Sequence, residues 1–137
     1  MTEQKKQNAT KAFYITTTLP YVNAEPHIGH AMEFIRADII ARYKKLMGFD
    51  VFFNTGTDEH GLKVFKKSEE EGVDIKNYVD KYAQKFKDLL KLLNISKDIH
   101  FVRTTDAHHK SAAQHFWELC DKSGDIYKKN YKIKYCV

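Results

Sequence analysis

Length, composition and charge limit what this chain can be. It has 137 residues, of which 42% are hydrophobic, and its formal net charge is +5. This length normally forms one domain with a modest core. No apolar run approaches the roughly 20 residues that cross a bilayer, so we expect no membrane association. The positive charge is spread along the chain, which permits contact with RNA or nucleotides without indicating either.

The N-terminus and the cysteines bear on location. Residues 1–11 are polar and contain no apolar segment, so they do not form a secretory signal, and we expect a disordered tail there. Cys120 and Cys136 are the only cysteines in the sequence, too few for a disulfide framework. Their number favours a reducing compartment and predicts a cytoplasmic location.

The first elements predict a strand–helix–strand unit. A β-rich run covers 12–19 and is followed by a proline-bounded loop. From 30 to 47 apolar residues recur at steps of three and four, and a glycine follows where a helix would end. The short apolar run 50–54 predicts a second strand and completes a βαβ unit. The apolar stripe of the helix, typical of a face turned to a core, consists of Met32, Ile35, Ile39, Tyr43 and Leu46.

The following segment predicts a loop and two helices. Residues 55–61 form the loop after the second strand, and with Gly29 the glycines Gly56 and Gly61 fall in candidate ligand loops. A short exposed helix follows over 62–71. Asp74 is a favourable N-cap for a second amphipathic helix. Its apolar stripe consists of Ile75, Tyr78, Tyr82, Phe86, Leu89 and Leu93.

The last third predicts one more strand and one more helix. Residues 100–103 resemble a strand, and Thr105 or Asp106 starts a helix that ends at Gly124. The inner face of this helix is expected to carry Ala113, Phe116 or Trp117, and Cys120. The alternating tyrosines and lysines of 125–137 predict strands of a following element. The fold class is therefore α/β, a doubly wound parallel sheet of about three strands with flanking helices.

The loop 20–30 has the features of a phosphate site. It opens onto a helix, where free N–H groups and the positive end of the helix dipole face one point. Gly29 has no side chain, so a flat ligand such as a purine can lie against its backbone. His27 and His30 are three residues apart, which can place both imidazoles on one face. There they can donate to a phosphate whose charge spreads in a transition state.

Plainer interpretations stand beside this one. The two histidines can be ordinary loop and helix-start residues. Glu33 lies one turn into the helix and is a candidate contact to a ribose. Glu59 and His60 are expected only to shape their loop through hydrogen bonds.

Three blocks of the sequence resemble a known family. His27-Ile28-Gly29-His30 is similar to the signature of the class I aminoacyl-tRNA synthetases. The segments 19–23 (Leu-Pro-Tyr-Val-Asn) and 54–61 (Asn-Thr-Gly-Thr-Asp-Glu-His-Gly) resemble methionyl-tRNA synthetases in particular. The similarity runs from about Ala12 to the last residue. It covers only the N-terminal part of that family's catalytic domain.

The resemblance implies a fold and an activity. It implies the first half of a Rossmann-like domain of the nucleotidylyltransferase type over 12–125, and the start of a connective insertion over 126–137. It implies a ligase that activates methionine with ATP and Mg²⁺ to methionyl-adenylate and transfers it to tRNA(Met). Such chemistry needs positioning and charge stabilisation more than a protein nucleophile. His27 and His30 would be the catalytic phosphate donors, and Gly29 and Glu33 would complete the ATP contacts.

The resemblance also implies an amino-acid pocket. Asp58 follows the second strand, at the carboxyl end where open α/β sheets bind ligands. Its carboxylate would hold the α-ammonium group by a charge-assisted hydrogen bond, and an Asx-turn residue is the plain alternative. Tyr21 would line the methionine pocket, while Thr18 and Leu19 would offer backbone groups. Cys136 is either the first ligand of a zinc knuckle, which would hold Zn²⁺ in the connective domain, or a core cysteine.

One part of the family pattern is absent. The second signature, Lys-Met-Ser-Lys-Ser, does not occur in the sequence. We therefore expect the isolated chain to be inactive and to need the remainder of the synthetase, as a covalent continuation or a complementary chain. Three other functions stay open: another class I synthetase or nucleotidylyltransferase, a non-catalytic tRNA-binding module, and a zinc hydrolase using His27, His30 and His60.

Overall fold

The computed structural model describes residues 11–132 and 134, and the chain divides into two compact units, Met1–Thr105 and Asp106–Val137. The expected α/β class, with a parallel sheet and flanking helices, is confirmed. Apart from Lys11, the expected tail 1–11 lies outside the described residues. The elements in chain order are β1 (Ala12–Thr16), α1 (Ile28–Leu46), β2 (Asp50–Thr57), α2 (Leu62–Glu70), α3 (Ile75–Leu92), β3 (His100–Arg103) and α4 (Ala107–Lys122).

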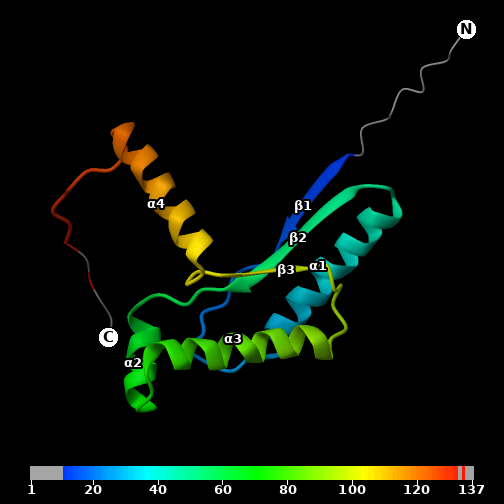
Figure 1. Cartoon of the computed structure of the whole chain (residues 1–137), viewed down its shortest axis with the longest axis horizontal. Helices are drawn as coiled ribbons and strands as arrows, with labels where there is room; N and C mark the ends of the chain where they lie inside the picture. The colour runs from blue at the N-terminus through cyan, green and yellow to red at the C-terminus, as the bar shows by residue number, and fades with distance from the viewer. Residues whose placement is uncertain (1–10, 133, 135–137) are drawn as a thin grey trace, which may run out of the picture. The chain divides into compact units, whose positions relative to one another are not determined.

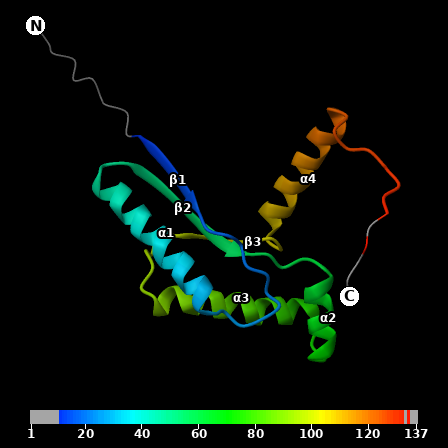
Figure 2. The ribbon, with the colours of Figure 1, turned by 180° about the vertical axis from the view of Figure 1, so that it is seen from behind.

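The strands form one parallel sheet in the order β1-β2-β3 (Figure 1). Phe13 pairs with Val51, and Thr55 pairs with Phe101. Because both connections advance in the same direction across the sheet, their helices α1 and α3 lie on one face of it, as the view from behind also shows (Figure 2). The carboxyl ends of all strands consequently meet at one edge.

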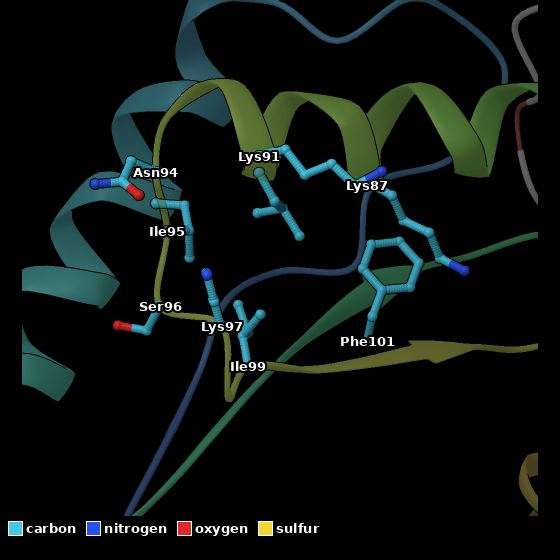
Figure 3. A pocket seen from close by; sticks show the side chains of 9 residues that line it. Lys87, Lys91, Asn94, Ile95, Ser96, Lys97, Ile99 and Phe101 are labelled. Carbon is cyan, nitrogen blue, oxygen red and sulfur yellow. The ribbon is translucent and has the colours of Figure 1, made fainter.

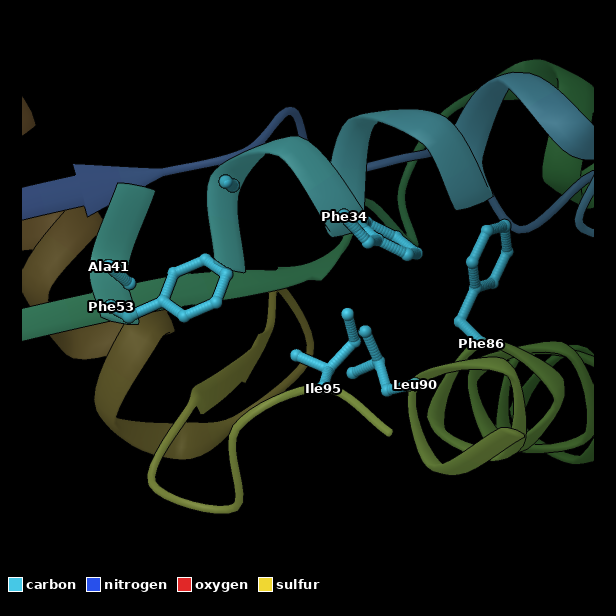
Figure 4. Packing of buried hydrophobic residues seen from close by; sticks show 7 residues of the cluster. Phe34, Ala41, Phe53, Phe86, Leu90 and Ile95 are labelled. Atoms are coloured by element: carbon cyan, nitrogen blue, oxygen red, sulfur yellow. The ribbon is translucent and has the colours of Figure 1, made fainter. Parts of the chain in front are cut away.

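A hydrophobic core fills the space between the sheet and these two helices (Figure 4). The side chains of α1 meet the buried Phe53 of β2, and α3 closes the cluster from the other side. Burial of each large apolar side chain contributes about 1.5–3 kcal/mol. The buried members of the cluster are Phe34, Ala37, Ala41, Phe53, Phe86, Leu90 and Ile95.

The face that α1 turns to the core is not the predicted one. The helix buries Ala31, Phe34, Ala37, Asp38 and Ala41. The predicted stripe is exposed instead, between 40% at Ile35 and 87% at Leu46. The helix is apolar on two sides, so periodicity alone does not decide which side packs. Alanines let the helix axis approach the sheet closely, and this favours the observed face.

A buried carboxylate joins α1 to the turn between α3 and β3. Asp38 Oδ1 accepts a hydrogen bond from the Ser96 backbone N–H at 3.0 Å, and the Ser96 hydroxyl contacts the same oxygen. Arg42 Nε donates to Asp38 Oδ2 at 2.6 Å, and its Nη2 donates to the Asn94 carbonyl at 2.7 Å. Each lone pair used in this way offsets part of the cost of burying the charge.

The helices after β2 follow the sequence closely. Asp74 caps α3 as expected, accepting from the N–H groups of Lys76 and Asn77. The predicted stripe of α3 buries Tyr78, Tyr82 and Phe86, whereas Ile75 stays 42% exposed. The two tyrosines join a second buried cluster that also contains Val22, Val64 and Val79.

The second unit departs from the expectation. Asp106 is the N-cap of α4, as predicted, but the helix buries none of its residues. The expected inner face stays open, with Phe116 68% and Trp117 64% exposed and Cys120 half-buried. Over 125–132 and at 134 the structure contains no strand, so the predicted strands are absent from these described residues.

The second strand is longer than predicted and includes Gly56. β2 runs to Thr57, so Gly56 belongs to the sheet and not to a ligand loop. It pairs with Val102 of β3, and a Cβ atom at Gly56 would lie 1.9 Å from the Val102 carbonyl oxygen. Glycine is needed here because the backbone of β3 approaches too closely for any side chain.

We expect Gly56→Ala to lower the free energy of unfolding by about 3 kcal/mol or more, the upper range for overpacking, because the clash is with main chain that cannot rotate away. Urea unfolding followed by circular dichroism measures this. Gly48→Ala is the control: nothing lies within 4 Å of its added Cβ, and only its φ of +81° opposes the change. That variant should lose about 1–2 kcal/mol. Equal losses in the two variants would contradict the close approach at Gly56.

Candidate active site

The candidate site residues lie at the carboxyl edge of the sheet and at the start of α1. Thr18, Leu19 and Tyr21 follow β1, and Asp58 follows β2. His27 is the N-cap of α1, and His30 lies in its first turn, so the helix begins at Ile28, two residues earlier than its predicted start. Hydrogen bonds connect these segments into one continuous edge.

The two histidines hold each other at the helix start. The His27 N–H donates to His30 Nδ1 at 3.2 Å, and the Gly29 N–H donates to His27 Nδ1 at 3.1 Å. This reciprocal pattern satisfies two of the N–H groups that every helix start leaves without partners. The rings are stacked, with centroids 3.8 Å apart and planes inclined by 25°.

These hydrogen bonds fix the tautomer of each neutral ring. Because Nδ1 accepts in both His27 and His30, the proton of each neutral imidazole lies on Nε2. Partial burial, followed by the neighbouring His27 ring, lowers the pKa of His30 below its ordinary value of 6.5. His30 is therefore neutral at pH 7, and each ring presents an Nε2–H donor.

Gly29 is constrained by the His27 ring. A Cβ atom at this position would lie 2.9 Å from Cε1 and 3.0 Å from Nδ1 of His27. A side chain would therefore displace the ring from its cap. The sequence indicated that Gly29 lets a ligand approach its backbone, and the structure adds this second reason for a glycine.

Glu33 ties the end of β1 to α1. Its Oε1 accepts from the Thr18 N–H at 2.7 Å, and its Oε2 accepts from the Thr18 hydroxyl at 2.8 Å. Both oxygens thus bind Thr18, which the sequence predicts to contact the methionine substrate. A ribose contact by Glu33 stays a prediction, and it would have to share the carboxylate with Thr18.

Asp58 extends the sheet edge by one residue pair. Its N–H donates to the Pro20 carbonyl at 2.9 Å, and its carbonyl accepts from the Val22 N–H at 3.3 Å. The pairing forms a parallel bridge between Tyr21 and Asp58. Tyr21 is 54% exposed, and Leu19 and Asp58 are half-buried.

Residues at the end of β3 were missed by the sequence analysis. Arg103, Thr104 and Thr105 bind the segment that carries Asp58 through the buried Glu59 and its backbone. A signal was present, because polar residues at the carboxyl end of a predicted parallel strand belong to the ligand edge of such a sheet. His60 shapes the loop as expected: its N–H donates to Asp58 Oδ1 at 3.3 Å, and its Nε2 lies 3.2 Å from the Thr104 carbonyl.

Other candidate features lie away from this edge. A pocket of about 410 Å³ lies between the end of α3 and the start of β3, at the amino edge of the sheet, and Lys87, Lys91 and Lys97 are among its lining residues (Figure 3).

Cys136 lies outside the described residues. In the described part of the chain no three His, Cys, Asp or Glu residues come close enough to hold a metal, so His27, His30 and His60 do not form the zinc centre of a hydrolase. None of the described helices is long and apolar enough to cross a membrane.

Sequence comparisons agree on the relatives of this chain. A family model described as tRNA synthetases class I (M) matches residues 13–137. The methionine–tRNA ligase of Thermotoga maritima is 54% identical over 125 residues, which are 91% of this chain and 20% of that protein. The methionine–tRNA ligase of Caldanaerobacter subterraneus subsp. tengcongensis is 47% identical over 127 residues, or 93% of this chain and 20% of that protein.

A solved structure gives the same relationship. The methionyl-tRNA synthetase of Mycobacterium tuberculosis in complex with methionyl-adenylate matches with a TM-score of 0.85 and 46% identity, over 89% of this chain and 24% of that one. The fold is therefore Rossmann-like, and the chain spans about a fifth of the length of the two curated relatives. With a family model that matches almost all of its length, the chain belongs to the class I tRNA synthetases (M).

Proposed function

We propose that this chain supplies the ATP loop and part of the amino-acid pocket of a methionine–tRNA ligase. The remaining catalytic parts come from further polypeptide, as a continuation or a separate chain. ATP and methionine react at the carboxyl edge of the sheet to give methionyl-adenylate and pyrophosphate, and the methionyl group then passes to tRNA(Met). The pair of stacked histidines with two Nε2–H donors at the start of α1 carries this proposal.

In this proposal, the residues at the start of α1 bind ATP, and the residues after β1 and β2 bind methionine. The methionine carboxylate is already ionised at pH 7, so its attack on the α-phosphate needs no protein base. His27 and His30 donate from Nε2 to phosphate oxygens as negative charge shifts during the transfer. Asp58 binds the α-ammonium group, Tyr21 lines the side-chain pocket, and Thr18 and Leu19 offer backbone groups to the substrate. These contacts hold the carboxylate in line with the phosphate.

The relatives support the substrate class. Two relatives are named methionine–tRNA ligases, and the M. tuberculosis structure contains methionyl-adenylate. In our proposal Mg²⁺ enters bound to the phosphates of ATP. A zinc site that begins at Cys136, and the cytoplasmic location, stay predictions from the sequence.

The first prediction of this proposal concerns the two histidines. Asparagine is a good N-cap and glutamine a good third helical residue, so His27→Asn and His30→Gln keep the hydrogen bonds of the helix start and remove the rings. Each variant should lower the kcat of methionine-dependent ATP–pyrophosphate exchange by about 10²–10³, as loss of a transition-state donor does. The assay uses a completed enzyme, meaning residues 1–137 joined to the remaining part of the T. maritima relative.

The control is the exposed His108 of α4, where His108→Gln should leave exchange unchanged. Exchange at the normal rate in both site variants would contradict the proposal. A tRNA-binding module without catalysis would instead retain RNA binding after His27, His30 and Asp58 are replaced together, with a steep salt dependence. Exchange driven by another amino acid would assign the site to a different synthetase of this class.

The lowered pKa of His30 predicts a pH-dependent stability. The folded state binds a proton on this ring less readily than the unfolded state does, so the contribution of His30 is complete above about pH 6.5 and is lost as the pH falls through the folded pKa. The unfolding free energy of the wild type should therefore fall more between pH 7.5 and 5.5 than that of His30→Gln. Parallel pH profiles of the two proteins in urea titrations would show that His30 does not contribute.

The isolated chain should not turn over. Without the triphosphate-clamping signature, which its sequence lacks, the 137-residue chain should show no methionine-dependent exchange, whereas the completed enzyme should show it. The same preparation of ATP, methionine and labelled pyrophosphate tests both proteins. Turnover by the isolated chain at the rate of the completed enzyme would mean that the site within 1–137 is sufficient.

A further inference from the structure

We infer that Glu59 is a positioning residue for the amino-acid half of the site, acting through the Asp58 carboxylate. The inference rests on the proposed role of Asp58 as the ligand of the α-ammonium group. Glu59 follows Asp58 directly and is itself no candidate ligand for the substrate, because its side chain is 0% exposed. Its effect must therefore pass through its neighbours.

Both oxygens of the Glu59 carboxylate accept hydrogen bonds from protein donors. Thr57 Oγ1 donates to Oε1 at 2.7 Å, and Arg103 Nε donates to the same oxygen at 2.6 Å. The Thr105 hydroxyl donates to Oε2. Arg103 Nη2 lies 2.6 Å from Asp80 Oδ1, so the network continues into α3. The negative charge of Glu59 is thus compensated at the end of β3.

The main chain on both sides of Asp58 is held to the same strand end. The Thr104 N–H donates to the Thr57 carbonyl at 3.2 Å, and the Glu59 N–H donates to Thr104 Oγ1 at 2.8 Å. These bonds fix the residue before and the residue after Asp58. The backbone of Asp58 can therefore change direction only if this end of β3 moves with it.

The opposite side of Asp58 is held by the loop after β1. Both backbone groups of Asp58 pair with that loop, through the Pro20 carbonyl and the Val22 N–H. Within the described residues its carboxylate accepts one hydrogen bond, a long one of 3.3 Å from the His60 N–H. An ionised carboxylate has room for several donors, so this side chain keeps capacity for an ammonium group. Glu59 uses its own carboxylate to hold that open carboxylate in place.

The charge of Glu59 is the feature to test. Glutamine keeps the shape of Glu59 but removes its negative charge, so the ion pair with Arg103 is lost and an amide NH2 replaces one of the two accepting oxygens. The strand end and the loop should then separate slightly. A displacement of about 1 Å at a binding group can reduce its effect about 100-fold.

The experiment measures binding of the α-ammonium group separately from binding of the carboxylate. Methioninol keeps the amine of methionine and lacks its carboxylate, whereas 4-(methylthio)butanoate keeps the carboxylate and lacks the amine. We expect Glu59→Gln in the completed enzyme to weaken methioninol binding by about 10-fold or more, in the range of a lost bond to a charged group, with less than about twofold change for 4-(methylthio)butanoate. Isothermal titration calorimetry measures both ligands.

Three further variants complete the design. Asp58→Asn should show the same selectivity, and the double variant should lose no more than Asp58→Asn alone, because both changes act through one group. Thr105→Val removes one donor to Glu59 without changing any charge, and it should weaken methioninol alone, by less than Glu59→Gln. Glu69→Gln makes the same chemical change at an exposed position of α2 and should change neither ligand.

The outcomes test the inference about Glu59 separately from the proposed role of Asp58. Equal weakening of both ligands by Glu59→Gln would assign Glu59 a general structural role and overturn the inference, and unchanged methioninol binding would also overturn it. The proposed function survives either result if Asp58→Asn still loses methioninol selectively. Unchanged methioninol binding in Asp58→Asn, or no binding of either ligand to the wild type, would overturn the proposed role of Asp58 and the inference together.

Discussion

Parallel pairing of β2 with β3 depends on the close approach of two backbones at Gly56, where a side chain would collide with Val102. The pairing carries β2 to Thr57 and places the next residue, Asp58, where neighbours can hold it from both sides. If β3 were displaced at this point, the bonds from Thr104 and Arg103 would be lost first. The side-chain bonds that hold the candidate amino-acid site therefore depend on a backbone contact between β2 and β3.

Two buried carboxylates stabilise the opposite ends of β3 in similar ways. Asp38 binds the turn before the strand through Ser96, and Glu59 binds the residues after it through Arg103 and Thr105. Each is compensated by an arginine and by neutral donors, as burial of a charge requires. They differ in what lies beside them. Asp38 supports packing of α1, whereas Glu59 adjoins Asp58. A buried ion pair adds little net stability compared with apolar residues of the same shape, so its location is more informative than its energy.

Sequence reasoning predicted most elements and the candidate residues after β1, at the start of α1 and after β2, but it missed the residues after β3 that hold them. The α3 stripe was predictable because only one side of that helix is apolar. For α1 the stripe beginning at Met32 competed with the one containing Phe34, and only contact with the sheet selects between them. Gly56 falls outside the predicted strand because glycine is a weak strand former. The backbone of Val102 in β3 lies so close to Gly56 that only glycine fits, and this contact joins residues far apart in sequence. The Glu59–Arg103 pair joins residues 44 apart in sequence, which no local pattern reveals.

The surface of the first unit supports the proposal that further polypeptide completes the enzyme. Parallel sheets normally have both faces covered. Here α1 and α3 cover one face, while the other carries an aromatic stack of Tyr14, Phe52 and His100, with ring centroids 5.6 and 4.1 Å apart. Tyr14 is 62% and Phe52 46% exposed. The outer stripe of α1 adds more exposed apolar area on the opposite side. Contiguous apolar surface of this kind in a soluble domain usually meets another protein segment. In the proposed completed enzyme, the further polypeptide would cover this surface.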